Sequence, residues 1–321
     1  MLVMNGNEKA VRRKQEQRWK EWVRKKIGFY ISTGRWDNVS DAQINAWLGN
    51  FDEEGQKWAL ALLNNFIYYP AQDVRQLCRY GLMKVIFYKQ LLGVDQSQDF
   101  CCTDDVLHQE LTDRIRETRL VPLLSEGNPT ESGNAIARLY TTVGLVNEHQ
   151  AIRPDEIAAY IDKKLCKRFL FVDDFMGTGE QLELFWNQSF PWLGVNGQDM
   201  SLAQISAQHT EVSFEYLVLL ATAAGLKYVE HRVPGLTIFS CEKLSEEYRI
   251  FGDNSIFFET VDDRQACKRY LENLCHQKGI HFAGYQELDF AIAFNHGAPD
   301  SCLPLFWEKN ANWIPLFKRR M

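Results

Sequence analysis

FLFVDDFMGTGEQL, at residues 169–182, carries the strongest structural signal in the chain. Its four leading apolar residues, 169–172, predict a buried strand, and Asp173 and Asp174 follow at the carboxyl end of that strand. The Gly-Thr-Gly at residues 177–179 predicts a tight turn into a helix. Because ligands bind outside the carboxyl ends of strands in an open parallel sheet, this segment predicts a ligand site.

The residue types of this segment indicate which ligand it binds. The turn glycines let the backbone approach an anion, and the following helix start offers N–H groups and the positive end of its dipole to a phosphate. Two carboxylates repel a phosphate unless a cation or a sugar hydroxyl pair lies between them. A ribose supplies that pair, with each charge-assisted hydrogen bond contributing about 1.5–3 kcal/mol. The acids would also stabilise a cationic ribosyl centre as the bond at C1′ breaks.

The order of residues also resembles a known motif. Four apolar residues, two acids, two apolar residues, one variable residue and Thr-Gly are similar to the phosphoribosyl-pyrophosphate motif of type I phosphoribosyltransferases. The resemblance implies that Asp173 and Asp174 are the catalytic acids, which hold the ribose or its Mg²⁺ cofactor. It implies that the substrate-binding residues of the segment are Phe175, Met176, Gly177, Thr178, Gly179, Glu180 and Gln181.

Two positions depart from the motif. Gly177 stands where many of these enzymes place an acid that handles the proton of the base, and Gln181 replaces a common phosphate-binding Ser or Thr. The general base is therefore not identified. Phosphoribosyl binding tolerates both changes, because backbone amides carry most of the phosphate contact.

Two other kinds of site also place acids at a strand end. A receiver-type acidic pocket and a nucleotide hydrolase would both explain Asp173 and Asp174. Neither requires the Gly-Thr-Gly that follows, and the chain lacks the GxxxxGK[ST] loop of such a hydrolase. We therefore favour the phosphoribosyl interpretation.

The flanking segments also bear on the site. Upstream, VPLLSEGNPTESGNAIARLY at 121–140 predicts a strand, a polar loop and a helix. Ser132 and Gly133, near the helix start, match the position of the pyrophosphate loop and are predicted to bind substrate, although an ordinary capped connection explains them equally. Downstream, residues 222–225 either line the pocket or turn the chain, and the turn is favoured.

Short apolar runs alternate with helical patterns after residue 110, which indicates an α/β domain at 111–321. We predict a mainly parallel twisted sheet of phosphoribosyltransferase type. The expected strands are 120–124, 168–172, 214–221 and 236–241, and the expected helices are 132–140, 154–164, 179–186 and 226–233. Residues 1–110 are predicted to form a helical N-terminal region, with three helices between residues 40 and 92 and a capping box of Ser40 and Gln43.

A basic amphipathic helix is predicted at residues 8–30. Trp19, Trp22, Val23, Ile27 and Tyr30 share one face, and Lys or Arg stands at positions 12, 13, 14, 18, 20, 24, 25 and 26. The favoured interpretation is a helix docked by its tryptophans with a solvated charged face. The alternative is a contact for RNA, DNA or an acidic partner.

The carboxyl end, residues 294–321, is rich in aromatic residues that are predicted to be core. Together with the central motif it resembles the PRTase-CE family of bacterial conflict-system effectors, some of them retron-associated, through Pro299-Asp300 and residues 303–307. The resemblance implies the toxic effector of an antiphage system such as a retron. It also implies a partner, such as a reverse transcriptase with its non-coding RNA–DNA complex or another defence protein, bound by the basic helix. Asn295 and His296 are candidates for a base contact or for a surface loop.

Composition excludes several classes of protein. The formal net charge of −6 argues against a surface that binds nucleic acid throughout. No run of 18 apolar residues exists and the first 30 residues are highly charged, so we expect a cytoplasmic protein without a membrane partner. The eight cysteines form no CxxC pair and are expected to be reduced thiols. Cys275, His276 and His281 lack a fourth ligand for zinc.

Two functional hypotheses follow from the sequence. The first is an enzyme, a phosphoribosyltransferase or a glycosidic-bond-cleaving nucleotide enzyme, that uses phosphoribosyl pyrophosphate or a related nucleotide. The alternative is a catalytically inactive module that senses nucleotides and acts through nucleic acid or a partner protein. Gly177 in place of an acid favours the second, whereas retention of Asp173, Asp174 and the Gly-Thr-Gly turn favours a working site.

Overall fold

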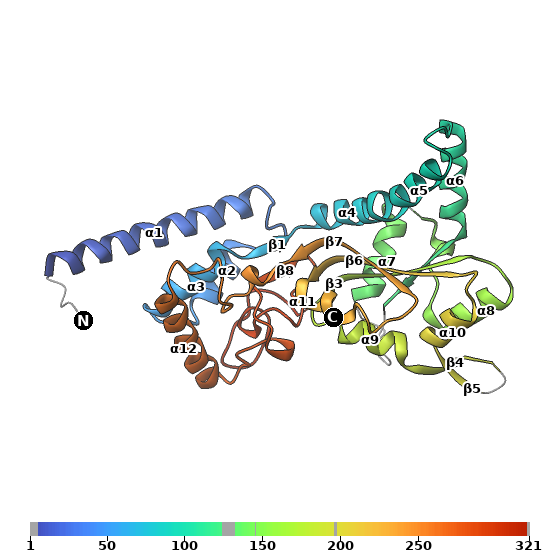
Figure 1. The fold of residues 1–321 in the computed structure, drawn as a ribbon. Helices are drawn as coiled ribbons and strands as arrows, with labels where there is room; N and C mark the ends of the chain where they lie inside the picture. Colours follow the sequence, from blue (N-terminus) through green and yellow to red (C-terminus); the bar gives the residue numbers. More distant parts are fainter. Residues whose placement is uncertain (1–5, 124–131, 145, 196–197, 320–321) are drawn as a thin grey trace. The chain divides into compact units, whose positions relative to one another are not determined.

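The computed structural model describes residues 6–123, 132–144, 146–195 and 198–319. The chain divides into two compact units (Figure 1). The first unit joins the chain up to Gln72 to the chain from Glu246 onward, and the second runs from Asp73 to Ser245. The predicted boundary at residue 110 falls inside the second unit, because the helix at 81–88 packs on two strands of that unit, β6 (Ser213–Thr222) and β7 (Leu236–Leu244).

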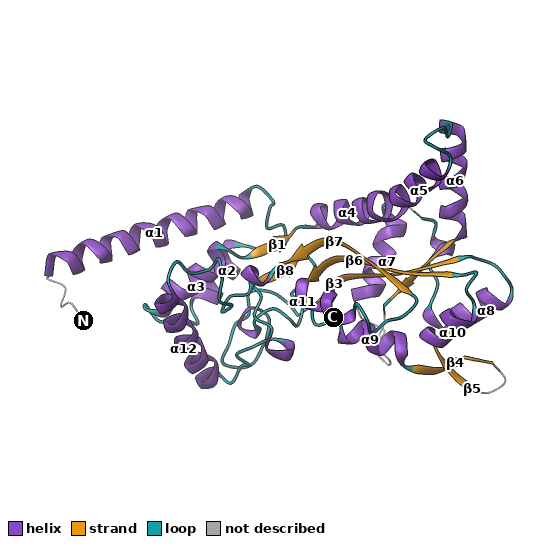
Figure 2. Cartoon of the chain, in the orientation of Figure 1, coloured by secondary structure: helices purple, strands orange, loops and turns teal. Residues whose placement is uncertain are grey.

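The second unit is built on a four-stranded parallel sheet (Figure 2). Its strands are, in spatial order, β2 (Thr118–Pro122), β3 (Arg168–Met176), β6 (Ser213–Thr222) and β7 (Leu236–Leu244). The α/β class, the parallel sheet and all four predicted strands are confirmed. Their boundaries differ. The strand predicted at 120–124 begins at Thr118 and ends at Pro122, and the strand predicted at 236–241 continues to Leu244. The strand predicted to end at Val172 continues to Met176, because its pairing with β6 extends to Ala221.

The order of the strands places a topological switch point between β2 and β3. Leu120 of β2 pairs with Leu170 on one edge and forms a parallel bridge with Ala151 on the other. With that bridge included, the chain visits the sheet in the order 2-1-3-4-5, the order of flavodoxin-like doubly wound sheets. In such sheets the ligand binds where the order reverses, outside the carboxyl ends of the strands. Those ends belong here to β2 and β3.

Helices cover both faces of this sheet, as buried parallel strands require. The helices α8 (Ile157–Asp162), α9 (Glu180–Asn187), α10 (Leu202–Gln208) and α11 (Ala223–Val229) share one core cluster with Phe169, Phe171 and Phe214. The helix α7 (Ser132–Thr142) contacts β2 and β3, and a π-helix, Gly81–Tyr88, contacts β6 and β7. Gly81 of the π-helix lies against Leu217 of β6. Since Leu217 stands between the cluster residues Tyr216 and Val218, its side chain points to the opposite face of the sheet, and the π-helix covers that face.

The rest of the second unit consists of further helices and a hairpin. Following α4 (Ala71–Tyr80) and the π-helix, α5 (Lys89–Ser97) and α6 (Asp104–Glu117) lead into β2. The antiparallel hairpin of β4 (Ser189–Val195) and β5 (Gln198–Ser201) was not predicted, because its sequence lacks a clear alternation of apolar and polar residues.

The first unit contains helices from both ends of the chain. They are α1 (Gly6–Ser32), α2 (Asp41–Leu48), α3 (Gly55–Asn64) and α12 (Val261–Lys278). Two short strands, β1 (Ile67–Tyr69) and β8 (Ile292–Phe294), pair in parallel. The predicted capping box at the start of α2 is confirmed, with Ser40 and Gln43 bonded to each other in both directions.

An aromatic core fastens the carboxyl end of the chain within this unit. The carbonyl of Leu305 accepts the indole N–H groups of Trp47 and Trp313 at 2.8 and 2.9 Å, and Phe306 stacks on Trp47 at 5.2 Å. Phe317 stacks on Phe66 at 4.9 Å. The prediction that the terminal aromatic residues are core is therefore confirmed for Phe306, Trp313 and Phe317, whereas Trp307 is half-buried. Within the described ranges, no helix has the length and apolar content needed to cross a membrane.

Candidate functional site

The acid pair lies inside β3 and is almost completely buried. Asp173 is 2% exposed and Asp174 is 0% exposed. Asp173 lies two residues after Phe171, so the two side chains point to the same side of the strand. Phe171 packs on Phe185 of α9, and the Asp173 side chain therefore points to the side of the sheet that α9 covers. The side chain of Asp174 points to the opposite face of the sheet. One carboxylate oxygen of Asp173 accepts the backbone N–H of Asp174 at 2.9 Å. The two carboxylates are therefore adjacent in sequence but lie on different sides of the strand.

The Gly-Thr-Gly turn leads directly from β3 into α9, as predicted. Gly179 has φ of +86°, a left-handed conformation that side chains rarely adopt. A Cβ on Gly179 would also lie 2.6 Å from a methyl carbon of Val229 and 3.0 Å from the carbonyl of Gly225. The Thr178 hydroxyl accepts the backbone N–H of Glu180 at 3.4 Å. The position therefore admits only glycine without a shift of the neighbouring helix.

A second turn holds the first one in place. Thr222 is the N-cap of α11, and its hydroxyl accepts the N–H of Gly225 at 2.8 Å. The same hydroxyl donates to the carbonyl of Gly177 at 2.6 Å. A Cβ on Gly225 would stand 2.2 Å from that carbonyl oxygen. Residues 222–225 thus turn the chain, as favoured from the sequence, but they also clamp the backbone of the Gly177–Gly179 turn.

The start of α7 joins this edge of the sheet. Gly133 packs so closely on the end of β2 that a Cβ would lie 2.3 Å from the carbonyl oxygen of Leu123. The N–H of Leu123 in turn donates to Val172 of β3 at 3.2 Å. Ser132 begins α7, and residues 125–131 of the loop at 125–134, which is predicted to face pyrophosphate, lie outside the described residues. The structure therefore brings Gly133, the acids and the glycine turn to one edge.

The other predicted substrate-binding residues differ in exposure. Phe175 and Met176 are 3% and 4% exposed, so their side chains belong to the core beneath the edge. Glu180 is half-buried and Gln181 is exposed in the first turn of α9. In this segment a ligand could contact the backbone of Glu180 and Gln181, but not the side chains of Phe175 and Met176.

The family model PRTase-CE matches residues 44–319. The chain belongs to the PRTase-CE family. The match begins within α2, spans both compact units and leaves out α1. No curated protein and no solved structure is significantly similar to the chain. The family name indicates a phosphoribosyltransferase-like function, in agreement with the acid pair and the glycine turn.

The wall behind Asp174 in this PRTase-CE protein carries no charge. Burial raises the pKa of the Cys78 thiol to about 12, with smaller contributions from Cys241 and the Asp174 carboxylate. Burial likewise raises the pKa of Cys241 to about 12 and that of Tyr140 well above its usual value. The Tyr140 hydroxyl faces the Cys78 thiol, so the polar groups of this wall interact with each other while remaining neutral. Cys78, Cys241 and Tyr140 therefore offer the Asp174 carboxylate no counter-charge.

The acids could supply part of a magnesium site. Among the described residues no group of three or more His, Cys, Asp and Glu side chains could hold a metal ion. Mg²⁺, however, is commonly bound through one or two carboxylates together with substrate phosphates. Asp173 and Asp174 fit that mode, in which the phosphoribosyl ligand would complete the coordination. The Cys275, His276 and His281 group is different, because Cys275 is buried and His281 pairs with Glu308 at 3.0 Å.

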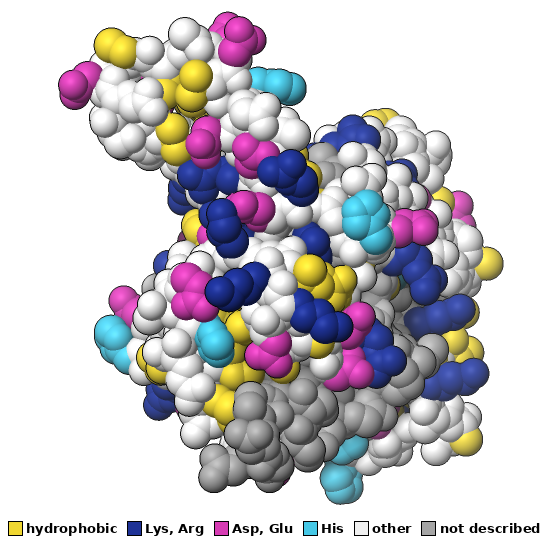
Figure 3. Space-filling view, turned by 90° about the vertical axis from the view of Figure 1, so that its right-hand side faces the viewer, with side chains coloured by type: hydrophobic (Ala, Val, Ile, Leu, Met, Phe, Trp, Pro, Cys, Tyr) yellow, Lys and Arg dark blue, Asp and Glu magenta, His cyan; other side chains and the backbone are white. Residues whose placement is uncertain are grey.

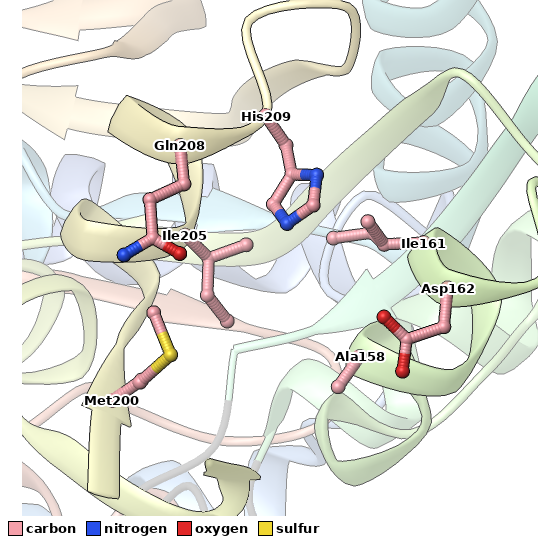
Figure 4. A pocket seen from close by; sticks show the side chains of 7 residues that line it. All are labelled: Ala158, Ile161, Asp162, Met200, Ile205, Gln208 and His209. Atoms are coloured by element: carbon pink, nitrogen blue, oxygen red, sulfur yellow. The ribbon is translucent and has the colours of Figure 1, made fainter. Parts of the chain in front are cut away.

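A small hollow in the second unit lies elsewhere (Figure 4). It is formed at the carboxyl ends of α8 and α10, which lead into the amino ends of β3 and β6. The residues around it are Ala158, Ile161, Asp162, Met200, Ile205, Gln208 and His209. His209 turns toward Glu211, at 3.2 Å. Since the glycine turn follows the carboxyl end of β3, this hollow is not the predicted site.

The candidates for a base contact, Asn295 and His296, belong to the first unit. Asn295 continues the pairing of β8 by donating its N–H to Tyr69 at 2.8 Å, and its carbonyl accepts from Asn38 at 2.7 Å. The ring of His296 stacks on Phe294 at 5.1 Å. These contacts give both residues a structural role at the end of β8.

Proposed function

We propose that this chain is a phosphoribosyltransferase-like enzyme with a phosphoribosyltransferase-type fold, which binds phosphoribosyl pyrophosphate or a related nucleotide at the carboxyl ends of β2 and β3. The observation that supports it best is the turn at Gly179. That turn follows two acids at a topological switch point, and Thr222 and Gly225 hold its backbone in place. A left-handed glycine turn opening a helix is a common phosphate cradle.

The 5′-phosphate would lie at the start of α9. There the first turn of the helix presents N–H groups together with the positive end of the dipole. Because the carbonyl of Gly177 is bonded to Thr222, it is held away from an incoming anion. The exposed side chain of Gln181 lies in the same turn and could donate to a phosphate oxygen.

The two acids would hold the ribose hydroxyls or a Mg²⁺ ion. Since Asp173 and Asp174 leave opposite faces of β3, they would contact different oxygen atoms or different shells of one ion. Each is at most 2% exposed, so the ligand must replace the groups that cover them. In the complex, the ribose hydroxyls would donate hydrogen bonds to these carboxylates, or the metal would neutralise their charge.

In the proposed reaction the C1′–oxygen bond to pyrophosphate breaks and pyrophosphate leaves with the electron pair. A lone pair on an acceptor base nitrogen, or on water, forms the new bond at C1′, and the acceptor proton passes to solvent. The buried negative charge of Asp173 and Asp174 would stabilise the cationic ribosyl centre. Mg²⁺, when bound, neutralises charge on the leaving group.

Turnover tests this proposal directly. Phosphoribosyl pyrophosphate and Mg²⁺ are incubated with the protein and a panel of bases, and release of pyrophosphate is followed by ³¹P NMR. We expect release by the wild type and a loss of at least about 100-fold in Asp173→Asn, because charge opposite the ribosyl centre is removed. Asp162→Asn, an exposed acid beside the hollow at the other end of the sheet, is the matched control. Equal rates in wild type and Asp173→Asn would contradict the assignment.

The second candidate is a catalytically inactive nucleotide-sensing module that acts through nucleic acid or a partner protein. The observation that favours it is Gly177, which leaves the site without the acid expected for the base proton.

Growth arrest distinguishes the two candidates. A toxic effector of an antiphage system, such as a retron, should arrest growth when it is expressed. Replacing both Asp173 and Asp174 by Asn should relieve that arrest if chemistry causes it. Ligand binding without turnover, with arrest unchanged by the double replacement, would support the sensor.

A further inference from the structure

Helix α1 differs from the rest of the chain in charge and lies outside the match to the family. Its 27 residues contain nine Lys or Arg against three Glu, a net charge of +6. The chain as a whole carries −6, so the remaining residues carry −12. At 1.5 Å per residue α1 is about 40 Å long, whereas α3, on which it packs, is about 15 Å long. Much of α1 (blue in Figure 1) therefore extends beyond its support.

One set of cations on α1 is used to hold the helix in the first unit. Lys26 donates to the carbonyl of Asn64 at 2.7 Å, and burial lowers the pKa of Lys26. Arg24 donates to Gln56 at 3.2 Å, and Lys20 pairs with Glu16 at 2.8 Å. These contacts, with the buried Val23 and Ile27, account for the inner face of α1.

The opposite face lies mostly outside these contacts, although the Lys26 ammonium is 5.6 Å from the centroid of the Trp22 ring. Lys14, Arg18, Trp22, Lys25 and Phe29 are spaced by four, four, three and four residues and form one line along α1, called here the outer stripe. All five are exposed, and Trp22 and Phe29 are 54% and 62% exposed. No described residue forms an ion pair or hydrogen bond with the three cations. Large rings left in water between cations indicate a binding surface.

The chemistry of the outer stripe narrows the choice of partner. A membrane surface requires a continuous apolar face, but here charged residues separate the rings. A second copy of α1 would bring together two helices of charge +6, without the apolar heptad of a coiled coil. Single-stranded nucleic acid combines the two features that the stripe presents, because bases stack on aromatic rings and phosphates bind cations.

The surface of the second unit offers a contrast. On the face drawn in Figure 3, Lys and Arg side chains lie among Asp and Glu side chains. Several pair directly, such as Arg116 with Asp113 and Lys167 with Glu117 at 2.8 Å. Paired charges of both signs do not attract a polyanion strongly.

We propose that the outer stripe of α1 binds single-stranded nucleic acid, with Trp22 and Phe29 stacking on bases and Lys14, Arg18 and Lys25 contacting phosphates. The two rings lie seven residues apart, about 10.5 Å along the helix, so they serve different nucleotides of one strand. Lys25 lies between them, where the backbone of the strand passes. This binding is independent of the proposed phosphoribosyl site.

The test uses fluorescence anisotropy with labelled 20-mer oligo(dT) and oligo(U) on the full chain. Replacing Trp22 and Phe29 by Ala is expected to weaken binding at least tenfold. Replacing Lys14, Arg18 and Lys25 by Gln is expected to weaken it similarly and to reduce the slope of log affinity against log salt by about 2, since each lost contact accounts for about 0.7. The side chains are exposed, so both variants should fold, which circular dichroism checks.

The matched control replaces Lys163, Lys164 and Lys167, exposed cations of the second unit, by Gln. It removes the same charge and should bind as the wild type does. The proposal is overturned if the control loses as much affinity as the outer-stripe variants. It is also overturned if polyglutamate competes as well as the oligonucleotide does and the ring replacements have no effect, because the partner would then be an acidic protein.

Discussion

Replacing Arg168 by Met is expected to lower the free energy of unfolding by about 3–5 kcal/mol. Arg168 donates to an oxygen of Glu215 at 2.8 Å, and Gln90 donates to the same oxygen at 2.8 Å. Glu215 is 6% exposed, and burial raises its pKa while Arg168 opposes that rise. Without the guanidinium the buried carboxylate keeps the hydrogen bond from Gln90 but loses the cation that is bonded to it, which is the costly case. Urea denaturation followed by circular dichroism measures the change.

The control for this prediction removes both charges. In Arg168→Met with Glu215→Met no buried charge is left uncompensated, so most of the lost stability should return. Since both residues lie at the amino ends of β3 and β6, ligand affinity per folded molecule should not change. A double variant no more stable than Arg168→Met would contradict the explanation.

The second large effect is expected at Gly225. Replacement by Ala places a Cβ 2.2 Å from the carbonyl oxygen of Gly177, and this backbone atom cannot rotate away as a side chain would. The glycine turn must then shift by about 1 Å, at a cost of about 1–3 kcal/mol in stability. A displacement of that size also disturbs a phosphate cradle, so affinity for phosphoribosyl pyrophosphate should fall at least about tenfold. Denaturation and calorimetry measure the two effects separately.

Gly93→Ala is the matched control, because a Cβ on Gly93 of α5 meets nothing within 4 Å. That change should be neutral, or stabilising by about 0.5–1 kcal/mol, since Ala favours a helix. If Gly225→Ala were as stable as the wild type and bound the ligand equally well, the clamp on the turn would have no functional importance.

The sequence predicted the local features of the site and missed those that depend on distant pairing. The strand, the acids and the glycine turn follow from one continuous segment, so their order could be recognised. The burial of Asp174 could not, because the groups that form the wall against it, Cys78, Tyr140 and Cys241, lie far from it in the chain. The clamp by Thr222 likewise joins residues 45 positions apart. A Thr three residues before a Gly indicates a helix cap at Thr222 from the sequence alone. Nothing in the surrounding sequence indicates that the Thr222 hydroxyl also contacts Gly177.

The division of the chain into two units could not be predicted either, because it also depends on contacts between residues that are far apart in the sequence. Strands β1 and β8 are only three residues long, and their partners Ile67 and Ile292 lie at opposite ends of the chain. Periodicity identifies helices but not which of them share a core. The aromatic residues of the terminal segment were recognised as core, yet their partners Trp47 and Phe66 precede the sheet domain altogether.

Isothermal titration calorimetry with phosphoribosyl pyrophosphate and Mg²⁺ tests the central claim most directly. The wild type should bind saturably, and the Asp173→Asn, Asp174→Asn double variant should bind at least about 100-fold more weakly, because two charge-assisted hydrogen bonds or a metal contact are lost. Asp162→Asn with Glu211→Gln, two exposed acids elsewhere in the second unit, should bind as the wild type does. A folded wild type that gives no heat of binding, or a double variant that binds equally well, would contradict a phosphoribosyl site at Asp173 and Asp174.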